Sequence, residues 1–244
     1  MNNIVNISGY KFVALPESEL EPMREDILPK AVDLGIEGTI ILSPEGINIQ
    51  LAGTKEAVDR YTAILRSYDY FSDVWLKESL SGYIPFEKMR VKIKKYIIPV
   101  GSDDIDPEHE PAPFLSPEQF KKWYEEGREM IILDTRKPME IEYGKFENAI
   151  DLNLNHFRGF NEAVDQLLEK YKDKPIVTYC TGGVRCEKAA PLMLKKGFKE
   201  VYQLEGGIIN YFERVGGDHW EGSCYVFDER VAVDPNLDIA QIIK

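Results

Sequence analysis

The segment PIVTYCTGGVRCEKAAP, residues 175–191, combines residue types at a spacing that is suited to chemistry. A stretch typical of a buried strand ends at Cys180, a loop containing Gly182 and Gly183 follows, and a helix is expected to begin near Arg185. The glycines let the backbone curl so that successive N–H groups point inward, and the helix N-terminus and Arg185 add positive charge. The sequence therefore predicts an anion-cradling loop made of Thr181, Gly182, Gly183 and Val184.

The same positive field acts on the thiol of Cys180. It is expected to lower the pKa from the value of about 8.5 for a free cysteine, so that the thiolate dominates at neutral pH. The alternative is a small buried hydrophobe at a strand end, which is a common fate of cysteine. The glycines and Arg185 weigh against this alternative, because glycines weaken local structure unless something must be cradled. We predict that Cys180 and Arg185 are catalytic.

The elements that must position this loop alternate between strand and helix patterns over residues 114–220. Such alternation predicts an α/β domain with a mostly parallel sheet that is covered on both faces, and ligands of such sheets collect at the carboxyl edge. The expected strands are 130–134, 150–152, 175–179 and 201–204. The expected helices are one that opens at 116–118, one over 159–171 and one over 185–196.

Residues 1–100 show a different order, which is strand, helix, two strands, helix, strand and one extra strand. This order predicts an α+β domain of the ferredoxin-like, split βαβ type. The strands are expected at 3–15, 38–42, 47–52, 74–78 and 89–99, and the helices at 17–33 and 54–67. Residues 101–113, which are acidic and proline-rich, are interpreted as a linker, and residues 221–244 as a C-terminal extension.

The net charge of −12 disfavours a broad electrostatic grip on nucleic acid, so RNA binding must depend on a local patch. One candidate patch is a run of cations that alternate with other residues in FEKMRVKIKKY, which the strand period places on one face. Its members are Lys88, Arg90, Lys92 and Lys94. The pattern by itself favours a solvated strand face whose lysines block edge pairing over an RNA contact.

Cysteine usage and the apolar pattern indicate the compartment. Three cysteines in 244 residues argue against a disulfide framework. The apolar runs are too short to span a bilayer, and the start MNNIVNISGY lacks the basic and apolar regions of a signal peptide. We expect a cytoplasmic protein without a membrane partner.

Cys186, six residues after Cys180, has two interpretations. It is either a resolving thiol that converts a persulfide or sulfenate on Cys180 into a disulfide, or a semi-buried helix residue. Asp134 and Arg136 likewise either support the catalytic loop or form an ordinary salt bridge, and we do not count them as catalytic.

No metal or organic cofactor is expected. His219 and Cys224 are two ligands where a zinc site typically needs four, or three plus water. His109, His156 and His219 do not form a recognisable iron triad, and the sequence contains no glycine fingerprint for a flavin or dinucleotide.

The second half of the chain resembles the rhodanese family. The resemblance is carried by ILDTRKPMEIEYGKFENAIDLNL, by the loop YCTGGVRCEKAA and by GFKEVYQLEGGIINY. It implies that Cys180 accepts sulfane sulfur as a persulfide, which requires a sulfur donor as a partner. The loop from Cys180 to Arg185 is one residue shorter than that of the related cysteine phosphatases, which favours sulfur over phosphate.

Together with SPEGIN near the start and WEGSCYVFDERVAV near the end, these motifs resemble the bacterial tRNA uridine hydroxylase family. The resemblance implies formation of 5-hydroxyuridine at the wobble position of tRNA, with molecular oxygen as co-substrate and Cys180 as the essential residue. The basic strand then becomes a phosphate contact for the anticodon region, with stacking by Tyr83, Phe86 or Tyr96.

The proposed chemistry is addition of Cys180 to C6 of uracil, with a persulfide or sulfenate on Cys180 as the alternative active species. Two other functions stay open from the sequence: a sulfurtransferase that uses thiosulfate or a persulfide, and a binding module that senses an anion or oxidant. The oligomeric state, the tRNAs used and the way oxygen is activated are not predicted.

Overall fold

The computed structural model describes residues 3–167 and 171–241 and divides the chain into two compact units. The first unit comprises Met1–Ile97 and Asp228–Arg230, and the second comprises Ile98–Phe227 and Val231–Lys244. The segment interpreted from sequence as a linker therefore falls within the second unit, where Ile105 and Ala112 are buried in a hydrophobic cluster. The C-terminal extension contributes to both units.

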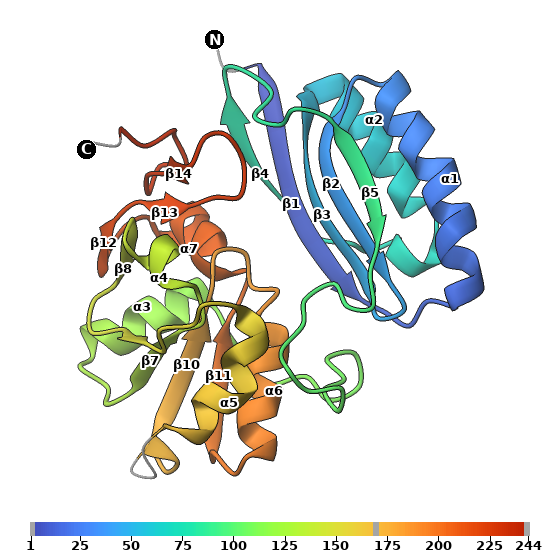
Figure 1. Cartoon of the computed structure of the whole chain (residues 1–244). Helices are drawn as coiled ribbons and strands as arrows, with labels where there is room; N and C mark the ends of the chain where they lie inside the picture. The colour runs from blue at the N-terminus through green and yellow to red at the C-terminus, as the bar shows by residue number, and fades with distance from the viewer. Residues whose placement is uncertain (1–2, 168–170, 242–244) are drawn as a thin grey trace. The chain divides into compact units, whose positions relative to one another are not determined.

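The first unit is a five-stranded sheet with two helices on one face, which confirms the expected α+β fold (Figure 1). The strand order is β4-β1-β3-β2-β5, in which β2 and β5 are parallel and the other pairs are antiparallel. Its elements are β1 (Ile4–Phe12), α1 (Glu17–Asp33), β2 (Glu37–Ser43), β3 (Gly46–Thr54), α2 (Lys55–Arg66), the short helix η1 (Asp69–Phe71), β4 (Leu76–Ser81) and β5 (Met89–Ile93).

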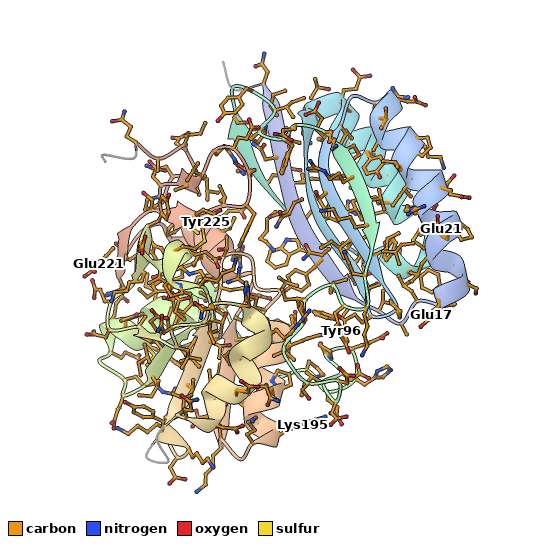
Figure 2. All side chains as sticks on the ribbon, in the orientation of Figure 1. Glu17, Glu21, Tyr96, Lys195, Glu221 and Tyr225 are labelled. Carbon is orange, nitrogen blue, oxygen red and sulfur yellow. The ribbon has the colours of Figure 1, made fainter. Side chains whose placement is uncertain are left out.

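The spacing of buried residues and the capping of helix N-termini explain the two helices of this unit. In α1 the buried residues recur every three or four positions, at Leu20, Met23, Ile27 and Ala31. Figure 2 shows Glu17 and Glu21 on the outer side of α1, pointing away from the sheet. Helix α2 begins after Thr54, whose side chain accepts a hydrogen bond from the backbone N–H of Ala57, 3.3 Å away.

The second unit is built on an all-parallel sheet with the order β6-β11-β10-β7-β9, as expected for its α/β pattern. The strands are β6 (Phe114–Leu115), β7 (Ile131–Asp134), β9 (Ile150–Asp151), β10 (Pro175–Tyr179) and β11 (Glu200–Leu204). The helices are α3 (Pro117–Glu125), α4 (Pro138–Ile141), η2 (Phe157–Gly159), α5 (Phe160–Asp165), α6 (Cys186–Lys195) and α7 (Gly207–Val215). Two small antiparallel pairs complete it, β8 (Gly144–Phe146) with β12 (Trp220–Gly222), and β13 (Cys224–Tyr225) with β14 (Ala232–Val233).

Helices cover both faces of this sheet. Val177 of β10 packs in a cluster with α3 and α7, while its neighbour Ile176 packs in a second cluster with α5 and α6, drawn in yellow and orange in Figure 1. Because successive strand residues point to opposite faces, a strand buried on both sides is apolar at nearly every position. This explains the run that precedes Cys180.

Several expected elements have other bounds in the structure: the strand expected over 3–15 ends at Phe12, and the strand expected over 74–78 is shifted to Leu76–Ser81. The expected strand over 89–99 ends at Ile93, and the expected helix over 159–171 is a 3-10 turn followed by α5, which ends at Asp165; residues 168–170 of that prediction lie outside the described residues. Helix α7 was not expected, because it begins at Gly207 directly after Gly206, and glycines are unfavourable in helices. Within the described parts of the chain, no helix is both long and apolar enough to cross a membrane.

Candidate active site

Cys180 lies at the carboxyl edge of the parallel sheet, directly after β10. Helix α6 begins six residues later, at Cys186. The start of α7 holds its loop, because the backbone N–H groups of Ile208 and Ile209 donate to the carbonyl oxygens of Cys180 and Thr181 at 3.0 and 3.1 Å. Gly207 has a φ of +68°, and a Cβ at this position would lie 2.3 Å from the Cys180 carbonyl oxygen. Only glycine allows this close approach.

The environment of Cys180 favours its thiolate. The side chain is buried, and its Sγ accepts a hydrogen bond from the backbone N–H of Gly183 at 3.1 Å. Burial alone would raise the pKa of the thiol, but a hydrogen bond from Cys186, the charge of Arg185 and the backbone N–H groups of Arg185 and Gly183 outweigh it and lower the pKa to about 6. Cys180 is therefore an anion at neutral pH, and hence the nucleophilic form of cysteine.

Arg185 is held on one side by a buried carboxylate. Its Nη2 donates to Oε1 of Glu140 at 2.8 Å, and both side chains are buried. Its Nη1 is also buried, but has no hydrogen-bond partner among the residues that the structure describes. Glu140 thus fixes Nη2 of the guanidinium, while the N–H donors of Nη1 stay available to a ligand.

Asp134 and Arg136 form a second buried ion pair beneath the loop. Nη2 of Arg136 donates to Oδ2 of Asp134 at 2.7 Å and to the carbonyl oxygen of Gly144 at 2.7 Å. The hydroxyl of Tyr179, the residue before Cys180, donates to the same Asp134 carboxylate. The pair therefore fixes the end of β10 through Tyr179.

The other two cysteines are buried and neutral. Cys186 opens α6, and burial and the neighbouring Cys180 raise the pKa of its thiol well above the usual value. Cys224 lies in β13, where burial raises its thiol pKa to about 12. In residues 3–167 and 171–241, no three side chains of the His, Cys, Asp and Glu types gather as a metal site would require.

The C-terminal extension reaches the loop, which the sequence analysis missed. The Thr181 hydroxyl donates to the carbonyl oxygen of Tyr225 at 3.4 Å, and the ring of Phe227 lies 5.5 Å from the guanidinium carbon of Arg185. Glu140 was missed as well. The available signals were the aromatic run CYVFDE and a glutamate that follows the Asp134 strand, and neither indicates a partner far away in sequence.

The basic strand belongs to the first unit. Arg90 and Lys92 lie in β5 on either side of the buried Val91, while Lys88 and Lys94 flank the strand just outside its ends. β5 is an edge strand that pairs only with β2 among the described strands. Arg90 makes an exposed ion pair with Glu87 at 3.5 Å, so the two strand cations differ in their surroundings.

The aromatic residues near this strand also differ in exposure. Tyr83 is exposed, whereas Phe86 and Tyr96 are half-buried. Tyr96, labelled in Figure 2, has the ammonium of Lys95 4.8 Å from the centre of its ring.

A cavity of about 920 Å³ lies in the second unit beyond the end of β9. Lys137, His156 and Arg158 are among its lining residues, together with the carboxylate of Glu162. Strand β9 pairs with β7, and β7 pairs with β10, so the cavity and the thiolate loop belong to the same edge of one sheet.

The fold and this loop define a rhodanese-type domain with a reactive cysteine, preceded by a ferredoxin-like domain. Residues 116–213 match the family described as Rhodanese-like domain, and residues 4–97 match the family described as UPF0176 acylphosphatase like domain. The chain is 46% identical to a tRNA uridine(34) hydroxylase of Bordetella avium, over 96% of this chain and 98% of the relative. It is 45% identical to proteins of the same name from Thiobacillus denitrificans, over 96% of each chain, and from Cupriavidus pinatubonensis, over 97% of this chain and 85% of the relative. The chain belongs to the tRNA uridine(34) hydroxylase family.

The lowered pKa of Cys180 predicts the pH dependence of its alkylation. A thiol whose pKa is lowered is ionised above that pKa, so the iodoacetamide rate should be constant above pH of about 6 and fall as the pH drops through this value. Cys186→Ala removes a hydrogen bond to the thiolate and should move the midpoint upward, whereas Cys224→Ala should not. Mass spectrometry of the Cys180 peptide gives the rate, and a midpoint near 8.5 in the parent protein would contradict this account.

Removal of the Glu140 charge should unfold the second unit more easily. Glu140→Gln removes the carboxylate that forms the ion pair with the buried guanidinium of Arg185, and breaking a buried pair in this way costs about 3–5 kcal/mol of unfolding free energy. Glu142→Gln removes a charge from an exposed side chain two residues away and should cost less than about 0.5 kcal/mol. Urea unfolding followed by tryptophan fluorescence measures both, and equal effects would show that the buried pair does not stabilise the unit.

Proposed function

We propose that this protein hydroxylates a wobble uridine of tRNA at C5, with Cys180 as the nucleophile that activates the base. The observation that carries the proposal is a buried thiolate beside a guanidinium that retains an unpartnered N–H donor, in a member of the tRNA uridine(34) hydroxylase family. Such a pair can add to an electron-poor ring and stabilise the negative charge that results.

The first step is covalent activation of the base. Sγ of Cys180 forms a bond to C6 of uracil, and the electron pair of the C5=C6 bond moves toward C5 and O4 as an enolate. Arg185 and the loop N–H groups stabilise this negative charge. C5 of the resulting enolate is far more nucleophilic than C5 of free uridine.

The second step transfers oxygen. C5 attacks an oxidant at the oxidation level of a peroxide; the C5–O bond forms, the O–O bond breaks, and the leaving oxygen departs as hydroxide and is protonated to water. Loss of the C5 proton and departure of the Cys180 thiolate restore the C5=C6 bond. Molecular oxygen supplies the oxidant after it takes up two electrons and two protons from a cellular reductant, such as a pair of thiols that becomes a disulfide.

We propose two sets of cationic residues as contacts for the RNA backbone. A chain with a net charge of −12 can attract phosphate groups only through such local patches. Arg90 and Lys92 present positive charge from an edge strand of the first unit, with Lys88 and Lys94 beside them. Lys137, His156 and Arg158 line the cavity at the sheet edge that also carries Cys180. Both sets are suited to phosphate groups of a single strand.

Nucleoside analysis tests the function. In a bacterial host that lacks its own genes of this family, wild-type protein should restore 5-hydroxyuridine in tRNA under aerobic growth, and Cys180→Ser should not, because serine is too weak a nucleophile. Mass spectrometry of digested tRNA measures the product. Equal nucleoside profiles with and without the wild-type gene, together with robust sulfur transfer from thiosulfate to cyanide, would instead support a sulfurtransferase.

The salt dependence of RNA binding tests the basic strand. The variant Arg90→Met/Lys92→Met should flatten the slope of log K against log salt by about 1.4, because each lost contact to single-stranded RNA removes about 0.7. Lys55→Met/Arg60→Met removes the same charge from the exposed side of α2 and serves as the control. Fluorescence anisotropy with an anticodon stem-loop gives the slope, and equal slopes for the two variants would exclude β5 from the interface.

A further inference from the structure

The buried Nη1 of Arg185 is a donor that finds no partner within residues 3–167 and 171–241. An unsatisfied buried donor costs about 1–3 kcal/mol, and nearly all buried polar groups in proteins avoid this cost. The opposite end of the same guanidinium is anchored on Glu140, so Nη1 has a fixed position. A fixed, dry donor beside a thiolate is suited to an acceptor that arrives with a ligand.

An aromatic group lies next to this donor. Phe227 has its ring centre 5.5 Å from the guanidinium carbon of Arg185, yet the residue is 41% exposed. The ring of Tyr225 meets it edge-on, with centroids 5.2 Å apart and an interplanar angle of 89°, and Tyr143 lies 5.5 Å beyond Tyr225. The thiolate loop is therefore bordered by rings, of which Phe227 is exposed to solvent.

We infer that Phe227 and Nη1 of Arg185 form the recognition site for the uracil base, with Phe227 stacking on the ring and Nη1 donating to O4. The inference rests on the proposed function and adds the residues that select the base. Cys180 and Nη1 are both buried, so a side chain must move before a base can touch them. Phe227 covers Arg185 and is exposed, and rotation of exposed side chains is fast. Once moved aside, the ring offers a face for stacking.

This arrangement distinguishes uracil from cytosine. Uracil presents the acceptor O4, whereas cytosine presents an amino group at the same position, which would place two donors against each other. Because a buried donor facing another donor stays unsatisfied, cytosine is rejected. The same bond strengthens when Cys180 adds to C6, since negative charge then develops on O4.

Binding and turnover of anticodon stem-loops with full-length protein test the site. Phe227→Leu should weaken binding of the uridine-34 RNA by about tenfold, mainly as a higher KM, because stacking on an aromatic ring contributes about 1–3 kcal/mol per base. Phe227→Trp should restore binding. Phe114→Leu is the matched control, because Phe114 is a similarly exposed phenylalanine, at 49%, in β6 of the same unit.

Two further measurements separate stacking from a structural role and from the proposed function. In Cys180→Ser/Phe227→Trp, the indole fluorescence should be quenched by uridine-34 RNA and about tenfold less well by cytidine-34 RNA at equal concentration. Equal affinities of the Phe227→Leu and Phe114→Leu variants, or equal quenching by both RNAs, would overturn the inference. A protein that binds uridine-34 RNA selectively through Phe227 but forms no 5-hydroxyuridine would instead refute the hydroxylase function and leave the site intact.

Discussion

Stabilisation of one buried negative charge, the thiolate of Cys180, determines how much of the second unit is arranged. A thiolate in a dry interior is unstable, because loss of hydration disfavours the charged form. In this protein other groups outweigh the effect of burial: Arg185, the thiol of Cys186 and two backbone N–H groups lower the pKa of Cys180 to about 6. Those N–H groups converge only if the loop curls tightly, and the curl requires Gly207 of α7 to approach the loop backbone. The chemistry of one sulfur atom thus depends on the start of a helix that follows it by more than twenty residues in the chain.

Arg185 in turn needs its own compensation, which Glu140 provides from a short helix after β7. Buried ion pairs seldom add net stability, since desolvation of both charges offsets their attraction. Their value lies in position: Glu140 fixes one edge of the guanidinium, and Asp134 with Arg136 fixes the end of β10 through Tyr179. The two ion pairs therefore hold the residues of the loop in place, and neither occupies Nη1 of Arg185.

The local parts of this site were predictable from the sequence, and the long-range parts were not. Strand β10 has the predicted bounds, because an apolar run that ends at a glycine loop has few alternatives. Phe227 and Glu140 carry no local signal, because their meaning depends on Arg185, which lies about forty residues away from each. Helix α7 was missed for a related reason: glycines normally weaken a helix, and only the tertiary contact of Gly207 with Cys180 explains a glycine as its first residue.

The distribution of charge limits how such a chain can hold RNA. With a net charge of −12, long-range attraction is unfavourable, and association depends on contacts within about a Debye length, roughly 8 Å at physiological salt. The cations that we propose as RNA contacts, on an edge strand and around a cavity, are compatible with this limit, since each would act on one nearby phosphate. In the proposed scheme, a few cations select the RNA strand and a stacking ring with one donor selects the base, which requires no large basic surface.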